Sequence, residues 1–246
     1  MKFNFFLSFL AVMALANGSS ARADEMPAVA QGLSNESEAG IVVNSGNANS
    51  QSYSLKEASS YGFYKNLFKS SGHFLETTAN DVVSARNWDF GLRYERYLLS
   101  GISMYLGQNV ESDRFAGFQQ RYNSDFGGKY AILKSEESYW NLEAGYRYSL
   151  QNLTTGTQTS DHFLRLFTEA SRSWTKTFSS KYWLELLPNL TDSAAYRINT
   201  ELSISSMLTS IFSIKSAYAI RFNNSPAGIA SRTTDSTFTT ALVAKF

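Results

Sequence analysis

The stretch from Trp140 to Leu150 reads WNLEAGYRYSL, and it decides the fold class. Every second residue is aromatic or aliphatic, and the residues between them are polar, charged or glycine. The first set is Trp140, Leu142, Ala144, Tyr146, Tyr148 and Leu150, and the second is Asn141, Glu143, Gly145, Arg147 and Ser149. A two-residue period separates the faces of a β-strand, whereas a helical period of 3.6 residues would scatter both sets. The stretch therefore predicts a strand with one apolar and one polar face.

The same alternation recurs from Ser37 to the last residue. We count about twelve such segments, each near the roughly ten residues that a membrane-spanning strand needs. Their approximate centres are Ile41, Ser54, Gly72, Phe90, Met104, Tyr122, Ala144, Leu166, Leu184, Leu202, Ala217 and Ala241, with blurred alternation around Ser54 and Gly72. The pattern predicts an all-β fold, a single antiparallel transmembrane β-barrel of about 12 strands (about 10 to 14). A soluble periplasmic β-protein is the alternative.

The composition agrees with a barrel and excludes several classes of protein. Charged residues make up 17% of the 246 residues, whereas soluble domains average about 25%. Aromatic residues make up 15% and there are only 3 prolines, which favours strands. A formal net charge of +1 gives no electrostatic basis for nucleic-acid binding. The lack of cysteine excludes disulfides, Cys-ligated zinc, a Cys nucleophile and a lipoprotein anchor.

The first residues predict an export signal. Lys2 is followed by a largely apolar run from Phe3 to Ala16, and Ala21-Arg22-Ala23 matches the small-x-small pattern of a signal-peptidase site. The run is shorter than the roughly 20 residues of a membrane helix, so an uncleaved anchor is the weaker reading. We expect a cleaved signal peptide over residues 1–23, a disordered periplasmic leader over 24–36 and the barrel over 37–246.

The connections and the last segment point to the outer membrane. Short turns are expected at Leu99–Gly101, Thr175–Lys176 and Leu208–Ser210 on the periplasmic side, and long loops over 152–161 and 223–233 on the outer side. The final segment alternates up to a C-terminal aromatic residue, through Phe238, Leu242 and Phe246. This stripe resembles the signal that the barrel-assembly machinery recognises. We therefore expect outer-membrane lipid and that machinery as partners, while the oligomeric state stays open.

Several short motifs carry a resemblance to a known family. They include Ser45-Gly46-Asn47, the run from Gly91 to Arg96, Gly127-Gly128-Lys129-Tyr130 and the run from Glu143 to Tyr148, in this order. With these motifs the chain resembles the salt-induced outer-membrane proteins of the YdiY-like family, a family of unknown function. Ala48 stands where members often have Thr, and the first strand lacks their Trp. The resemblance implies an outer-membrane barrel without catalytic residues to transfer.

A search for catalytic or metal-binding chemistry finds little. The two histidines, His73 and His162, lie in no recognisable catalytic motif and show no transition-metal spacing. Glu111 and Asp113 could bind calcium, but such a pair is generic. Gly127-Gly128 precedes no helix, so we interpret it not as a phosphate loop but as a pair that relieves crowding or bends a barrel strand. We expect no cofactor, no metal, no nucleic-acid partner and no enzymatic activity.

The informative set is the predicted inner face of the barrel. The residues that alternate with each apolar stripe should point into the lumen, and they include both acids and bases. They are Asp89, Arg93, Glu95, Arg121, Asp125, Lys129, Glu143, Arg147, Arg165, Glu169, Glu185, Arg197, Glu201, Lys215 and Arg221. One interpretation is a selective pore lining, and the other is an ion-pair network that fills a narrow lumen. Nearly balanced charge slightly favours the network. We hypothesise that Arg93, Arg147, Arg165 and Arg197 pair with Glu95, Glu143, Glu169 and Glu201.

The sequence leaves three functions open. The sequence favours a structural or envelope-stress (salt-response) barrel with a charged, narrow lumen. A small-solute channel is the first alternative. An outer-membrane enzyme acting on lipid or peptide is the second, and it lacks an identifiable catalytic group.

Overall fold

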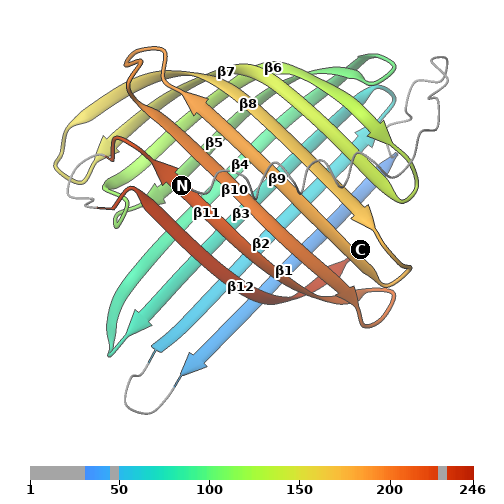
Figure 1. Ribbon diagram of the computed structural model, residues 1–246, viewed down its shortest axis with the longest axis horizontal. Coiled ribbons are helices and arrows are strands. Elements are labelled where there is room, and N and C mark those ends of the chain that lie inside the picture. Colours follow the sequence, from blue (N-terminus) through green and yellow to red (C-terminus); the bar gives the residue numbers. More distant parts are fainter. Residues whose placement is uncertain (1–30, 45–49, 227–231) are drawn as a thin grey trace, which may run out of the picture.

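The computed structural model describes residues 31–44, 50–226 and 232–246, and it shows one closed antiparallel barrel (Figure 1). The predicted signal peptide, and the predicted leader up to residue 30, lie outside the described residues. Each of the twelve predicted centres falls within its own strand. The strands are β1 (Gly32–Asn44), β2 (Ser50–Phe63), β3 (Asn66–Ala79), β4 (Val82–Leu99), β5 (Ile102–Asp113), β6 (Phe118–Lys134), β7 (Ser138–Leu153), β8 (Gln158–Ser173), β9 (Phe178–Pro188), β10 (Tyr196–Met207), β11 (Phe212–Asn223) and β12 (Thr234–Lys245).

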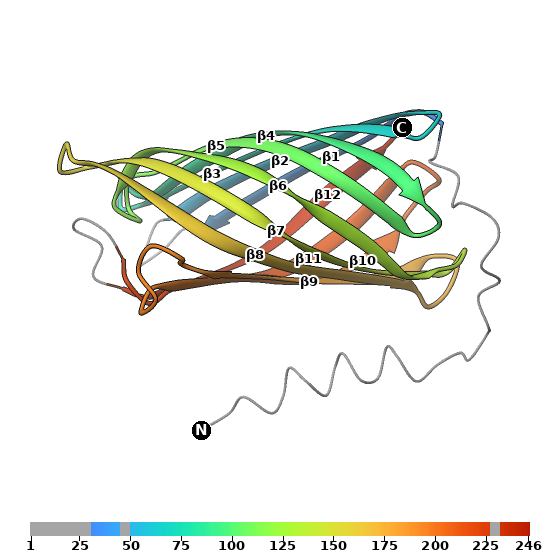
Figure 2. The ribbon, with the colours of Figure 1, turned by 90° about the horizontal axis from the view of Figure 1, so that it is seen from above.

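Each strand pairs with its neighbours in sequence, and β12 returns to β1 to close the barrel. Figure 2 shows β4 and β5 on the opposite side of the barrel from β9 and β10. No helix in the described part of the chain is long and apolar enough to cross a membrane.

The start of the barrel differs from the prediction. β1 begins at Gly32, which pairs with Gly62 of β2, so the residues from Gly32 to Glu36 belong to a strand and not to a leader. The segment is rich in small and polar residues, which predicts disorder, but strand pairing uses the backbone amide and carbonyl groups, which every one of these residues has.

The seam between β1 and β12 is short. The two strands are paired in register only from Glu36–Lys245 to Ala39–Leu242. Two backbone hydrogen bonds of 3.0 Å between Asn35 and Phe246 extend the seam at its C-terminal end. The last residue thus helps to close the barrel. Phe238, Leu242 and Phe246 all lie exposed on the outer face, and their recognition by an assembly machinery stays a prediction.

The connections agree in part with the predicted sides. The end of the barrel that carries the C-terminus has short turns, with two residues between β4 and β5 and four between β10 and β11. The opposite end has the longest connection with a complete description, residues 189–195. The long loop expected over 152–161 is wrong, because β7 extends to Leu153 and β8 begins at Gln158. The polar residues of this segment are strand ends that stand above the apolar band.

The two faces of the strands follow the predicted alternation. Leu142, Tyr146, Leu166, Leu202 and Ile214 are exposed on the outer face, as a lipid-facing wall requires. The residues between them point inward, where Glu143 and Ser213 are buried.

Leu142→Arg should therefore impair folding into bilayers far more than Asn141→Arg. Leu142 is 42% exposed on the outer wall, whereas Asn141 has the inward parity of Glu143. Arginine near the middle of a bilayer costs about 2–4 kcal/mol in such barrels, while the lumen is already polar. The measurement is the free energy of folding into lipid vesicles by urea titration. Equal losses in the two variants would contradict the assignment of faces.

Candidate functional site in the barrel lumen

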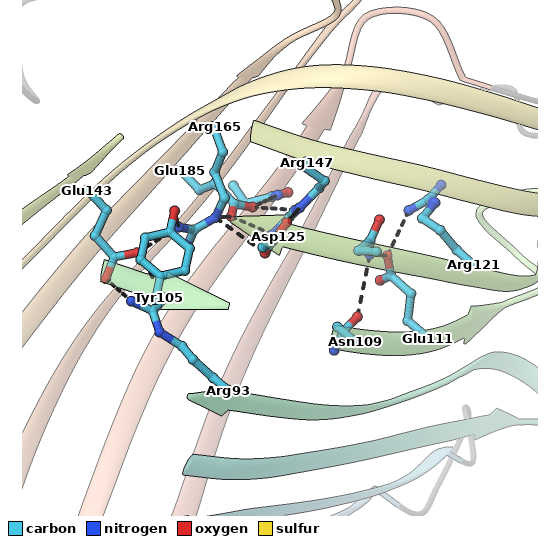
Figure 3. A network of polar contacts seen from close by, with 12 residues as sticks. Arg93, Tyr105, Asn109, Glu111, Arg121, Asp125, Glu143, Arg147, Arg165 and Glu185 are labelled. Carbon is cyan, nitrogen blue, oxygen red and sulfur yellow. Dashed lines mark hydrogen bonds and ion pairs between the residues drawn. The ribbon is translucent and has the colours of Figure 1, made fainter. Parts of the chain in front are cut away.

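A buried tyrosine belongs to a network of polar contacts inside the barrel (Figure 3). Tyr105 of β5 is only 1% exposed, and its hydroxyl accepts a hydrogen bond from Nη1 of Arg165 at 3.1 Å. The guanidinium of Arg93 lies over the ring, 3.9 Å from its centroid. Both arginines also donate to Glu143 of β7, Arg93 through two bonds of 3.0 and 2.7 Å and Arg165 through one of 2.6 Å. Side chains from β4, β5, β7 and β8 are thereby joined across the interior.

Two glycines make room for this tyrosine. Gly127 of β6 and Gly145 of β7 pair directly with each other. A Cβ atom at either position would lie 2.6 Å from the Tyr105 hydroxyl, and 2.5 Å from a backbone carbonyl oxygen of the neighbouring strand. Such distances are well inside van der Waals contact, so both positions need glycine. This confirms the prediction that glycine at Gly127 relieves crowding, whereas Gly128 points outward.

The network continues around the wall toward β9. Arg147 donates to both oxygens of Asp125, at 2.6 and 2.8 Å, and to Glu185 at 3.1 Å. Arg165 donates from Nε to the same Glu185 at 2.7 Å. Charge-assisted bonds of this kind hold planar groups in fixed orientations. The arginines and carboxylates therefore form one continuous chain from Arg93 to Asp125.

A second cluster, made of basic side chains, surrounds a carboxylate that is fully buried. Glu95 of β4 is 0% exposed, and three cations lie within ion-pair distance of it. The nitrogens of Arg93, Lys69 and Lys129 are 2.8, 2.9 and 3.3 Å from its oxygens. A buried carboxylate is costly unless it is paired, and this cluster supplies the compensation. Arg93 links it to the chain described above.

Other ion pairs bridge strands that are not neighbours. Lys56 of β2 lies 3.2 Å from Glu201 of β10, and Lys215 of β11 lies 2.5 Å from Glu38 of β1. Because three strands separate β2 from β10 around the wall, the first pair reaches across the lumen. Side chains from strands four positions apart around the barrel are therefore close enough to meet.

The sequence-based hypothesis that four lumen arginines form ion pairs with four glutamates is correct for some of these residues and wrong for others. Arg93 pairs with Glu95 and Glu143, and Arg165 also pairs with Glu143. Glu169 instead pairs with Lys181, at 2.7 Å, and Glu201 pairs with Lys56. Each has a lysine in reach from another strand, and the stagger of the strands brings that lysine closer than the expected arginine.

The remaining arginines also have other partners. Arg147 pairs with Asp125 and Glu185, which belong to the predicted lumen set. The guanidinium of Arg197 stacks on Phe163, with Asp161 3.8 Å away. Asp161 belongs to the segment 152–161 that the sequence predicts as a loop, so the alternation does not assign it to the lumen, whereas the structure places it in β8.

Sequence reasoning missed further lumen charges, among them Glu38, Lys56, Lys69, Glu111, Asp161 and Lys181. Lys181 shares the inward parity of Glu185, so strict use of the alternation would have found it. Lys56 and Lys69 lie in β2 and β3, where the alternation is blurred. Glu111 accepts from Arg121 at 3.2 Å and from Asn123 at 2.9 Å, so its carboxylate is engaged within the lumen.

Other predicted lumen positions have simpler surroundings. Asp89 lies 3.4 Å from Nδ1 of His73, and Arg221 of β11 stands opposite Asp235 of β12 in the strand register.

The residues considered for catalysis or metal binding form no such site. His162 lies on the outer face, where its ring contacts Tyr146 and Tyr148. Asp113 accepts a hydrogen bond from the backbone amide of Ala116. Within the described residues, no group of three His, Asp or Glu side chains could hold a metal ion.

Comparison with protein families identifies a relationship over nearly the whole barrel. Residues 37–246 match a family model described as "Protein of unknown function, DUF481". The chain belongs to this family. No curated protein matches the chain.

Solved structures with a similar fold include outer-membrane channels. The NanC porin has a TM-score of 0.53 at 10% identity, with 86% of this chain and 98% of that chain covered. The COG4313 outer membrane channel from Pseudomonas putida F1 also has a TM-score of 0.53, at 9% identity, with 92% of this chain and 100% of that chain covered. At these identities the likeness shows the fold alone, a membrane-embedded β-barrel of the porin type.

Proposed function

We propose that this DUF481 member is a non-enzymatic, structural barrel of the outer membrane whose lumen is closed at its centre. One observation carries the proposal: Glu143 is held by both Arg93 and Arg165, and this unit is buried against Tyr105 in the barrel interior. A lumen that is packed and paired in this way passes little solute. Such a barrel adds a rigid element to the envelope without a leak, which suits a role in salt or envelope stress.

A small-solute channel is the second candidate, and one feature favours it. Ala58 of β2 and Ser71 of β3 are directly paired, point inward and are exposed. Small exposed side chains on this part of the wall leave space beside the charged network. A solute path along β2 and β3 would then be lined by few side chains large enough to block it.

Ion conductance in planar bilayers distinguishes the two candidates. If the network closes the lumen, the purified wild-type protein should conduct poorly across a wide range of salt concentrations. Steady, open-channel conductance of the wild type would support the channel instead.

A separate measurement tests location. We expect the mature chain to begin at Asp24, as determined by intact mass, and to fractionate with the outer membrane. Recovery as a soluble periplasmic species would contradict both candidates.

A further inference from the structure

A polar patch interrupts the lipid-facing wall on β1, β2 and β3. Glu57 of β2 has the outward parity of Leu55 and Tyr61 and is exposed. Its paired neighbours on either side are Ser37 of β1 and Gly72 of β3. Other outward positions at this level are also small or polar: Asn35, Ser59 and Ser70. This polar patch explains why the alternation is blurred around Ser54 and Gly72.

The carboxylate of Glu57 is held in place by uncharged donors. The hydroxyls of Ser37 and Ser59 donate to it at 2.5 and 2.9 Å, and the side-chain amide of Asn35 donates as well. The group is thus an organised acceptor cluster. In a membrane, ionisable groups face protein or water, because hydrocarbon offers no hydrogen bonds.

The depth of Glu57 limits what can cover it. Tyr53 and Tyr61 are exposed on the same face and bracket Glu57 along β2. Interfacial aromatic girdles mark the two edges of the apolar band of a barrel. Each tyrosine lies about 13 Å from Glu57 along the strand, at about 3.3 Å per residue. Glu57 is therefore near mid-depth, beyond the reach of lipid headgroups, and its cover must be another protein surface.

A hollow of about 600 Å³ adjoins the patch on the same face. Its floor contains the small residues Ala39, Gly72 and Ala244, and its rim contains the large residues Leu55, Phe74 and Leu242. Small residues allow close approach of transmembrane elements, and large rim residues can fill a matching hollow. The face thus carries large protruding side chains, a hollow that could receive them, and a carboxylate that can accept a further hydrogen bond.

We infer that the outer face of β1, β2 and β3 is the contact surface for a second copy of this chain. A two-fold symmetric contact uses the same patch on both copies, so the patch must complement itself. The large rim residues and the hollow meet this condition, and the Glu57 carboxylate, which has lone pairs beyond its three intramolecular bonds, can accept a further donor from the other copy. The contact also lies beside the short seam between β1 and β12, the least extensively paired junction of the barrel, and would support it from outside.

Cysteine cross-linking of the full chain in lipid vesicles tests this inference. The chain has no cysteine, so each variant carries a single thiol. Gly72→Cys places it in the hollow beside Glu57, where an added Cβ meets only one atom, at 3.8 Å. Gly128→Cys is the matched control: it lies in a hollow of about 580 Å³ on the far wall, and an added Cβ there meets only one atom, at 4.0 Å. On oxidation, Gly72→Cys should form at least tenfold more disulfide-linked dimer.

A second variant and a measurement on the wild type complete the test. Glu57→Leu, combined with Gly72→Cys, should reduce the dimer about tenfold, the effect of losing one polar contact between transmembrane elements. Light scattering of the wild-type protein in a mild detergent should give the mass of two chains. A single-chain mass, or equal cross-linking at Gly72→Cys and Gly128→Cys, would overturn the inference. A third result would also overturn it: a wild-type protein that is a monomer and retains bound phospholipid, together with a Glu57→Leu variant that has lost this phospholipid.

Discussion

Arg165→Ala should raise the single-channel conductance of the barrel several-fold and lower its thermal stability. Arg165 is 6% exposed and donates to Glu143, Glu185 and Tyr105, so its removal leaves two buried carboxylates without one of their cations. Breaking a buried ion pair by removing one partner costs about 3–5 kcal/mol. The shorter side chain also opens space in the lumen. Planar-bilayer recording and thermal unfolding followed by circular dichroism measure the two effects.

Arg86→Ala is the control for this prediction. Arg86 pairs with Glu76 on the outer face, where its side chain is 55% exposed. Exposed pairs contribute about 0–1 kcal/mol, so this variant should keep the conductance and nearly all the stability of the wild type. If Arg165→Ala changes only ion selectivity in a barrel that already conducts, the closed-lumen proposal fails. The channel then becomes the better description.

Gly127→Ala should prevent stable folding of the barrel. The added methyl group would lie 2.5 Å from the Ala144 carbonyl oxygen and 2.6 Å from the Tyr105 hydroxyl. The first contact is with the backbone of the paired strand, which cannot turn away without breaking the ladder between β6 and β7. Overpacking typically costs about 1–3 kcal/mol, and contact with backbone places this variant at or above the upper end. The measurement is the fraction of folded protein after refolding into vesicles.

Gly128→Ala provides the comparison at the next position. Its added methyl group would point outward and meet only the Ser103 carbonyl oxygen, at 4.0 Å. This variant should fold like the wild type. Tyr105→Phe should not rescue Gly127→Ala, because the clash with the backbone of β7 remains. Normal folding of Gly127→Ala would show that β6 and β7 are farther apart than the structure places them.

The number of strands and the direction of most side chains could be predicted from the sequence. The reason is local: a strand alternates its side chains whatever its neighbours are, so the stripe from Trp140 to Leu150 already separates the lipid face from the lumen. The prediction was weakest around Ser54 and Gly72. There the outer face carries Ser37, Glu57 and Gly72, and a polar outer face removes the contrast on which the alternation depends.

The partners of each lumen charge could not be predicted in the same way. Pairing depends on the stagger of the strands and on closure of the barrel, which bring together residues from strands far apart in the wall. Arg93 reaches Glu143 three strands away, and Lys56 meets Glu201 across the lumen. The place of Tyr105 between Gly127 and Gly145 follows from the same geometry. By itself the sequence determined a transmembrane barrel with a charged interior. Only the tertiary structure decided which of these charges meet, because contact between distant strands exists only once the barrel has closed.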